Sequence, residues 1–379
     1  MGFAQLLRRF GSAAEALLAL PELAAQGGKA KAYLAASEQQ VNEEICAVKA
    51  AGARYIFHDS PEYPPLLREV VGAPPILIAR GTVDLARRTP VAMVGARNAS
   101  ASAVRFARDM ARELAEAGYP VVSGLARGID GAAHEGALNG YAGGDGAAST
   151  MAVIAGGIDV AYPPEHAALQ ERIADEGLLI TEVPPGIEPT RGHFVMRNRI
   201  IAGIAAGTVV VEAAMKSGSL ITARIAGDYG REVMAVPGSP MDPRSHGCNE
   251  MIREGAILVQ RAQDIIELIT SFDGVARSHF HEEGGGAAWG GAEEDFGLGE
   301  ERTLPGGVCV EDAAEEAPEA AGGLLQERVL GLLSVAPVGM DELVRQAGAS
   351  AAGVQRALVE LELGGQVLRH AGGRVSRAV

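Results

Sequence analysis

The sequence predicts an α/β protein, with a parallel-sheet core between a small helical unit and a C-terminal winged-helix unit. Three observations predict this fold class. From about residue 90 to residue 270, apolar runs of strand length alternate with segments of helical spacing. The first 50 residues show helical spacing only, and the last 55 show helical spacing followed by a hairpin pattern. The length of 379 residues fits two or three domains.

The N-terminal region is predicted to be mostly helical. Apolar residues recur at helical spacing up to Pro21, which is expected to break the first run, and again from Tyr33 to Val48. Residues 54–67 then predict a strand followed by a proline-rich turn, and residues 72–81 predict another short strand between breakers. We place an N-terminal helical domain at residues 1–75.

The core is predicted at residues 76–270 and contains six runs rich in apolar and β-branched residues. They are residues 91–95, 119–123, 150–156, 178–182, 208–212 and 233–236. Such continuous runs are typical of parallel strands that are covered on both faces. The C-terminal ends of these strands should therefore meet at one edge of the sheet, where open α/β sheets bind their ligands.

The net charge of −15 is unevenly distributed along the chain. Residues 281–320 hold twelve acidic side chains and only one basic one, so that segment carries −11 and the rest only −4. The net charge therefore does not exclude a local site for an anion such as nucleic acid. Residues 271–322 lose periodicity and are predicted to be an acidic flexible linker.

The three cysteines are far apart and form no Cys-x-x-Cys pair, which argues against a disulfide framework and against a thiolate zinc site. The chain shows no signal-peptide core and no run of about 18 apolar residues that would span a membrane. We therefore expect a cytoplasmic protein without a bound metal.

Residues 323–379 predict a winged-helix domain. Helical patterns begin near Leu325 and cover Met340–Ala347, and Ser350 is placed to cap a third helix before a hairpin at residues 366–376. The third helix carries Glu360 and Glu362 as well as Arg356, so it is a weak reader of duplex DNA, and a structural or protein-docking role is at least as well supported.

The motifs of the core indicate anion binding without a common cofactor. Neither Gly-x-Gly-x-x-Gly nor Gly-x4-Gly-Lys-Ser/Thr occurs, so the core is Rossmann-like without the usual dinucleotide or P-loop signatures, and we expect no cofactor. Instead, glycine turns with arginines or hydroxyls follow the strands, which is the chemistry that binds phosphate oxygens. Phe194 is the aromatic residue best placed to stack on a base, and His193 lies beside it. The candidate residues are Gly95, Arg97, Ser123, Gly124, Arg127, Gly128, His193, Phe194, Arg197, Asn198, Arg199, Ser217, Gly218 and Ser219.

Several of these residues have a simpler structural interpretation. Arg97 and Arg127 fit ordinary surface positions as well as a binding site. Arg197 and Arg199 flank Asn198, so one of the two arginines is a candidate structural clamp for a carboxylate at a strand end, Glu212 or Glu182. Asp130 and Asp159 are expected to be internal acceptors that fix their loops, and His134 is expected to be packed or solvated rather than an acid–base group.

The sequence resembles the DprA/Smf family over roughly residues 54–270, with the terminal domains in the expected order. The resemblance rests on the strand-end motifs just described and on residues 59–67, which match the family's box of an Asp followed by Tyr-Pro-x-x-Leu. The matching stretches are residues 94–97, 123–134, 155–163, 197–203, 217–223 and 236–239. The chain departs from the family pattern at Ala96, where a serine is usual, at Val195, where a proline is usual, and in an insertion at residues 141–149.

The resemblance implies an extended Rossmann-like fold with an N-terminal helical (SAM-like) domain, which binds single-stranded DNA and forms a homodimer through the Rossmann-like domain. It implies a protein that loads the RecA recombinase onto incoming single-stranded DNA, against single-strand-binding protein, during natural transformation. It also implies that the chain has no catalytic residues. Arg97 and Arg127 would hold phosphates, and the loops at 197–199 and 217–219 would complete the pocket.

Two other functions stay open from the residues alone. One is a Rossmann-like nucleotide or phosphoribosyl hydrolase that uses the same strand-end glycines, with Glu182 or Glu212 as the acid–base group. The other makes the C-terminal winged helix the working DNA reader, in which case removal of residues 323–379 would abolish binding. A hydrolase should turn over a mononucleotide, whereas a strand binder should gain affinity with oligonucleotide length.

Overall fold

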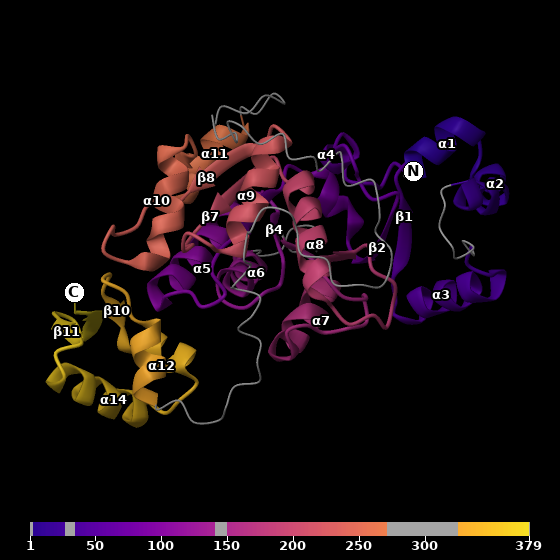
Figure 1. Cartoon of the computed structure of the whole chain (residues 1–379). Helices are drawn as coiled ribbons and strands as arrows, with labels where there is room; N and C mark the ends of the chain where they lie inside the picture. Colours follow the sequence, from indigo (N-terminus) through magenta and orange to yellow (C-terminus); the bar gives the residue numbers. More distant parts are fainter. Residues whose placement is uncertain (1–2, 27–34, 141–149, 271–324, 379) are drawn as a thin grey trace.

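The molecule is built on one large twisted sheet covered by helices, with a small helical domain at the N-terminal end and a domain of helices and a small three-stranded sheet at the C-terminal end (Figure 1). The computed structural model describes residues 3–26, 35–140, 150–270 and 325–378. The predicted linker at 271–322 and the predicted insertion at 141–149 therefore lie outside the described residues. Among the described helices, none is long and apolar enough to cross a membrane.

The sheet has nine strands in the order β1-β2-β6-β5-β4-β3-β7-β8-β9, and the seven from β6 to β9 run parallel. The predicted core strands are present, and the residues of β3 to β8 are buried because helices cover both faces. The parallel strands are β3 (Val91–Val94), β4 (Val121–Ser123), β5 (Thr150–Val153), β6 (Leu178–Thr181), β7 (Gly207–Val210), β8 (Glu232–Ala235) and β9 (Ile257–Leu258). Two antiparallel strands, β1 (Arg54–Phe57) and β2 (Ile76–Gly81), extend the sheet beyond β6.

Helices cover the two faces of the sheet in two groups. The cores on one face contain residues of α5 (Ala101–Glu116), α6 (Ile129–Gly140), α7 (Ala167–Glu176) and α11 (Ala262–Thr270). The core on the other face contains residues of α4 (Pro65–Arg68), α8 (Arg191–Ile204), α9 (Gly218–Asp228) and α10 (His246–Arg253). Three short 3-10 turns, η1 (Val83–Arg87), η2 (Pro164–His166) and η3 (Pro243–Ser245), lie in the connections.

The strand order places a topological switch point between β3 and β7. The chain steps from β3 through β4 and β5 to β6, and then returns along α8 to add β7 on the other side of β3. At such a point the loops that follow neighbouring strands diverge and leave room for a ligand. The loops after β3, β4, β5 and β7 therefore share one edge of the sheet.

Helices α5 and α6 lie unusually close together because α6 presents glycines to α5. A Cβ atom on Gly136 would lie 2.9 Å from the Cα of Arg108 and closer still to its carbonyl oxygen. One turn later, a Cβ on Gly140 would lie 3.0 Å from the Cα of Arg112. Side chains at these two positions would force the helix backbones apart.

The N-terminal helices are α1 (Phe3–Phe10), α2 (Ala13–Gln26) and α3 (Glu38–Ala50). The expected break at Pro21 is wrong, because α2 continues through that residue. A proline in a helix removes one backbone hydrogen bond to the carbonyl four residues earlier, and Leu17 at that position is exposed, so water can satisfy the carbonyl. Strand β1 lies before the domain boundary expected at residue 75 and pairs with β2, which lies after it. The large sheet therefore contains strands from both sides of that boundary.

The C-terminal domain has the predicted winged-helix outline. It consists of α12 (Leu325–Leu332), β10 (Val338–Gly339), α13 (Met340–Ala347), α14 (Ala351–Leu363), β11 (Val367–His370) and β12 (Arg374–Arg377). The Ser350 Oγ accepts a hydrogen bond from the Gly353 amide at 3.2 Å, as expected for the N-cap of α14.

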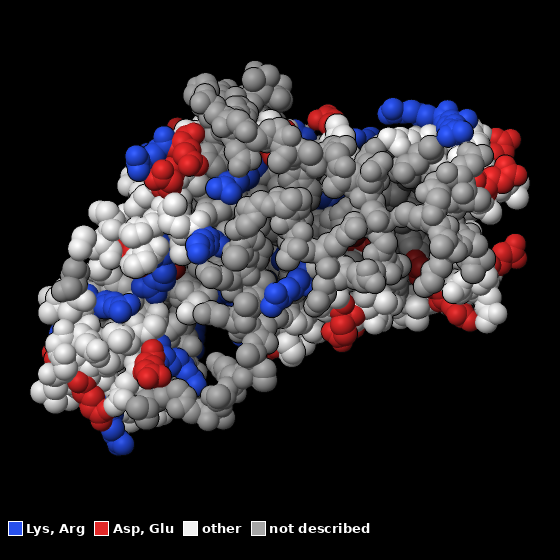
Figure 2. Space-filling model, in the orientation of Figure 1, with Lys and Arg blue, Asp and Glu red and all other residues white. Residues whose placement is uncertain are grey.

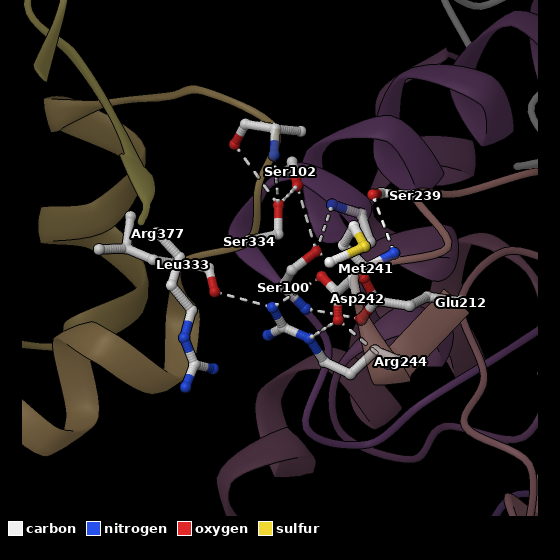
Figure 3. Close-up of polar contacts among 12 residues, drawn as sticks. Ser100, Ser102, Glu212, Ser239, Met241, Asp242, Arg244, Leu333, Ser334 and Arg377 are labelled. Carbon is white, nitrogen blue, oxygen red and sulfur yellow. Dashed lines mark hydrogen bonds and ion pairs between the residues drawn. The ribbon is translucent and has the colours of Figure 1, made fainter. Parts of the chain in front are cut away.

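The winged-helix domain packs against the sheet domain at α5 and η3 (Figure 3). The Arg244 guanidinium donates to the carbonyl oxygens of Gly331 and Leu333, at 2.9 and 2.7 Å, and so caps the C-terminal end of α12. The Oγ atoms of Ser102 and Ser334 lie 2.9 Å apart across the same boundary. A cavity of about 360 Å³ remains between the two domains beside these contacts.

Candidate nucleic-acid interface

The first arginine loop joins β3 to α5 and places Arg97 against an aromatic side chain of α8. The Arg97 guanidinium carbon lies 5.1 Å from the centre of the Phe194 ring, within the range of a cation–π interaction. The Tyr162 ring lies on the same aromatic residue, with 5.4 Å between the ring centres. A cation and two aromatic rings thus come together at the C-terminal edge of the sheet, from three separate loops or helices.

The second arginine loop, residues 124–128, joins β4 to α6 and lies directly against the first. Gly128 has a φ of +72°, and a Cβ there would lie 2.5 Å from the Arg97 carbonyl oxygen and closer to that of Ala96. The Ile129 amide also donates to the Ala96 carbonyl at 3.3 Å. Only glycine allows this approach, so the position of one arginine loop depends on the other.

Arg127 projects from the second loop and is more than half exposed. Its guanidinium forms an ion pair with Glu165 of η2. Exposed ion pairs contribute little to stability, at most about 1 kcal/mol. A phosphate at this edge would therefore compete with the Glu165 carboxylate for Arg127 at little energetic cost.

Arg197 lies beneath the loops and is only 5% exposed. Its Nη1 donates to the Val153 carbonyl at 2.9 Å, and the guanidinium crosses Gly124, where a Cβ would lie 2.7 Å from Nη2 and closer to Nη1. The buried Asp130 carboxylate accepts from the Gly124 amide at 3.1 Å, as predicted for an internal acceptor. Burial raises the pKa of Asp130, while the nearby charge of Arg197 acts to lower it. Burial lowers the pKa of Arg197 to about 10.

Arg199 is the residue that forms the clamp expected for one of the two arginines. Its guanidinium pairs with Glu182 and donates to the Gly72 carbonyl at 3.0 Å, and its side chain is only 16% exposed. Glu212, the other carboxylate considered, instead accepts from the amide and hydroxyl of Ser100, at 2.8 and 2.6 Å (Figure 3). Arg197 and Arg199 are thus held in internal contacts, whereas Arg97 and Arg127 lie at the edge.

The remaining candidate residues are divided between the interior and the edge. The Ser123 hydroxyl is buried and donates to the Met93 carbonyl at 2.6 Å, so it supports β3 from inside. Ser217 and Ser219 bond to each other at 2.8 Å at the start of α9, with Gly218 between them. His193 accepts from the Thr190 amide at the start of α8, and Asn198 is half-buried on that helix.

Gly95 completes the first loop at the end of β3. A Cβ at this position would lie 2.5 Å from a side-chain carbon of Ile129 and 3.0 Å from the Glu212 carbonyl oxygen. The loop that carries Arg97 therefore lies against both α6 and the end of β7, which only a glycine at residue 95 permits.

His134 is fully buried on α6, as expected for a packed histidine. Burial, with the nearby charges of His166 and Arg197, lowers the pKa of His134 to about 3. Below the ordinary value of 6.5, the unfolded chain therefore binds a proton at this residue that the folded chain does not bind. The free energy of unfolding should then fall as the pH falls from 6.5 toward 3.

We expect this loss to be about 1 kcal/mol for each pH unit below 6.5. Urea unfolding of the wild type and of a His134→Gln variant at pH 7 and pH 5 measures it, because the variant cannot take up this proton. The raised pKa values of Asp130, Glu182 and Glu212 act in the opposite direction, but they act in both proteins and cancel in the difference. Parallel pH profiles for the two proteins would contradict the assignment.

Three residues at this edge were not among the candidates from sequence. Tyr162 lies against Phe194, Glu165 pairs with Arg127, and His166 bonds to the Leu125 carbonyl at 2.9 Å. All three lie in the connection between β5 and α7, after the glycine pair at 156–157. In the sequence, the stretch 155–163 that matches the DprA/Smf pattern includes Tyr162 but neither Glu165 nor His166, so these two residues carried no signal.

Basic and acidic side chains are unevenly distributed over one face of the molecule. In Figure 2, separate groups of Lys and Arg atoms lie over the left part of the sheet domain and near the winged-helix domain, another lies at the upper right edge, and Asp and Glu atoms lie mostly at the edges of the view. The overall negative charge therefore does not extend evenly over this surface.

Comparison with known proteins identifies the family. A family model described as DNA recombination-mediator protein A matches residues 54–270, more than half of the chain. The chain belongs to the DprA/Smf family. Models of the DprA winged-helix domain and of the DprA-like N-terminal HHH domain match residues 313–373 and 1–47. The DprA/Smf assignment thus covers all three parts of the chain.

Individual DprA and Smf proteins are similar over most of the chain. The putative DNA processing protein DprA of Mycobacterium tuberculosis is 40% identical over 301 residues, which cover 76% of this chain and 74% of the relative. Protein Smf of Escherichia coli is 34% identical, with 84% of each chain covered. The X-ray structure of DprA from Streptococcus pneumoniae aligns with a TM-score of 0.61 and 36% identity, covering 71% of this chain and 92% of that one.

Proposed function

We propose that this chain is a single-stranded-DNA-binding recombination mediator that acts without catalysis or a cofactor. In this proposal it loads RecA onto incoming single-stranded DNA that single-strand-binding protein would otherwise cover, during natural transformation. It does so in the cytoplasm, as a homodimer formed through the Rossmann-like domain. The family membership supports a role in DNA processing, and the arrangement of the sheet edge supports the strand-binding step.

The observation that carries the proposal is the contact between the two arginine loops beside an aromatic cluster. Arg97 lies over Phe194, and the loop of Arg127 touches the backbone of Arg97. Arginines hold the phosphate backbone, and aromatic rings stack on bases of any sequence. Such a site binds single strands, whose bases are free to stack, and has little sequence preference.

A solved relative supports the same choice of ligand. DNA processing protein A from Helicobacter pylori was solved in work on its single-stranded DNA binding mode. It aligns with a TM-score of 0.51 and 27% identity, covering 58% of this chain and 97% of that chain. We infer that the shared sheet domain of this chain binds the same class of ligand.

The hydrolase alternative has less support from the carboxylates it requires. Glu182 is paired with Arg199, and Glu212 accepts from Ser100, so both are held in internal contacts. The winged-helix alternative also has less support, because Glu362 of α14 is exposed and forms an ion pair with Arg369 of β11. These two alternatives serve as outcomes of the test below.

Fluorescence anisotropy of labelled oligo-dT across a salt series tests the strand-binding step. We expect the wild type to bind more tightly as the oligonucleotide is lengthened and to bind duplex of equal length poorly. The Arg97→Glu/Arg127→Glu variant should lose most of this affinity. Its slope of log K against log salt should be shallower by about 1.4, because each lost single-strand phosphate contact accounts for about 0.7.

An Arg253→Glu variant is the matched control, since Arg253 is 77% exposed near the end of α10 and lies at the opposite edge of the sheet. It should bind like the wild type. Normal binding by the double variant would overturn the site, and loss of binding on removal of residues 323–379 would favour the winged helix. On DNA covered by single-strand-binding protein, the wild type should stimulate the DNA-dependent ATP hydrolysis of RecA, and the double variant should not.

A further inference from the structure

Leu125, at the centre of the second arginine loop, has a backbone conformation that a leucine rarely adopts. Its φ is +58°, in the left-handed region, and it is the only described residue other than glycine with a positive φ. Its side chain is fully buried. A leucine stays in this region only where its surroundings hold it there.

The amide of Leu125 is held by His134 of α6. The Leu125 N–H donates to the His134 Nε2 at 3.3 Å, and the Nδ1 of the same ring lies 2.8 Å from the Thr150 Oγ1. The Thr150 hydroxyl donates its own proton to the Val121 carbonyl at 3.1 Å. The Thr150 oxygen must therefore accept from the ring, so His134 is neutral with its proton on Nδ1 and its lone pair directed at Leu125.

The carbonyl of Leu125 is held by a second histidine from a different element. The His166 Nδ1 lies 2.9 Å from the Leu125 carbonyl oxygen and donates to it, since a carbonyl can only accept. The His166 ring also lies against Gly131, where a Cβ would be 2.8 Å from a ring carbon. Two imidazoles, one on α6 and one on η2, thus form hydrogen bonds with the amide and the carbonyl of the same strained residue.

The two hydrogen bonds to Leu125 fix the part of the loop that faces the proposed ligand. Arg127 and Gly128 follow within three residues, and Gly128 rests on the carbonyls of Ala96 and Arg97. If Leu125 relaxed toward an ordinary backbone conformation, the chain direction after it would change. Both arginines would then leave the relative positions that the structure shows.

We propose that His134 and His166 are positioning residues for single-stranded DNA, acting through Leu125 to set the placement of Arg127 and Arg97. This inference rests on the proposed function, because it concerns how that binding edge is arranged. Neither histidine needs to touch DNA. Each supplies one hydrogen bond that a smaller amide side chain can imitate, so matched variants separate the bond from the bulk of the ring.

The test compares four full-length variants by oligo-dT anisotropy. His166→Ala removes the donor, whereas His166→Asn keeps an N–H near the Nδ1 position and loses the same ring packing. His134→Met removes the acceptor and fills the space, whereas His134→Gln keeps an acceptor near the Nε2 position. We expect His166→Ala and His134→Met to weaken binding about fivefold to tenfold, as the loss of one hydrogen bond does, and the amide variants to restore much of it.

The salt dependence separates positioning from a general loss of stability. With Arg127 displaced, His166→Ala should give a slope of log K against log salt that is shallower by about 0.7, as Arg127→Ala does. In an Arg127→Ala background, His166→Ala should change the slope no further. If His166 only stabilised the fold, the molecules of His166→Ala that remain folded would bind with the wild-type slope of log K against log salt.

The inference would be overturned if His166→Ala kept the wild-type affinity and salt slope. It would also be overturned if His166→Asn and His166→Ala lost the same affinity for oligo-dT. Neither result would contradict strand binding itself. Absence of oligo-dT binding by the wild type would instead contradict the proposed function itself. If His134→Met fails to fold, the comparison of His166→Ala with His166→Asn, at a partly exposed residue, is sufficient to test the inference.

Discussion

Replacing Gly136 by alanine is expected to destabilise the protein by about 3 kcal/mol, the upper part of the range for overpacked cores. The added methyl group would overlap the backbone of Arg108, and a helix backbone cannot rotate away as a side chain can. Helices α5 and α6 must then separate. Because each helix begins just after one of the two arginine loops, the same variant should also weaken binding to single-stranded DNA.

Gly331→Ala is the matched control, because Gly331 also lies in a helix but, apart from its own helix backbone and chain neighbours, has no atom within 4 Å of the position of an added Cβ. It should be neutral or should stabilise the protein by about 0.5 to 1 kcal/mol, the ordinary gain from alanine in a helix. Urea unfolding midpoints of the two variants measure the difference. Equal midpoints would mean that the glycine contact does not set the spacing of α5 and α6.

Arg197→Met is expected to cost about 3 to 5 kcal/mol, because it removes the stronger of the two nearby positive charges, Arg197 and Arg97, that stabilise the buried Asp130 carboxylate. The methionine also cannot donate to the Val153 carbonyl, which Arg197 bonds in the wild type. Equilibrium unfolding in urea measures this loss. Arg127→Met, which changes an exposed arginine of the same edge, should change stability by less than about 1 kcal/mol.

The double variant Arg197→Met/Asp130→Asn distinguishes a charge effect from a packing effect. Removing both charges avoids an uncompensated buried ion, so the double variant should be more stable than Arg197→Met alone. The introduced asparagine can still accept from the Gly124 amide through its side-chain oxygen. Strictly additive losses would show that the two residues stabilise the protein independently.

The core of the fold was predictable because each central strand is buried on both faces. That burial requires an uninterrupted apolar run, and the predicted runs 91–95 and 178–182 extend only one residue beyond the strands β3 and β6. The edges were harder to predict. Strand β9 has only two residues and is defined by pairing with β8, and the pairing of β2 with β6 joins segments about 100 residues apart. The domain boundary at residue 75 stays a prediction.

For the candidate site, the sequence predicted which loops lie together but not the direction of the side chains. Glycine turns beside arginines correctly indicated which loops gather at the sheet edge. They did not reveal that Arg197 turns inward over Gly124, because a glycine that makes room for a ligand and one that makes room for a neighbouring side chain look alike in sequence. Likewise, Glu165 and His166 become part of the edge only through contacts across the fold.

Helix α5 connects the first arginine loop with the winged-helix domain. Its first residue, Ala101, belongs to the apolar core of the winged-helix domain, and Arg108 two turns later forms an ion pair with Glu342 of α13. The same helix begins four residues after Arg97. A displacement of the winged-helix domain would therefore act on the start of α5, within four residues of Arg97.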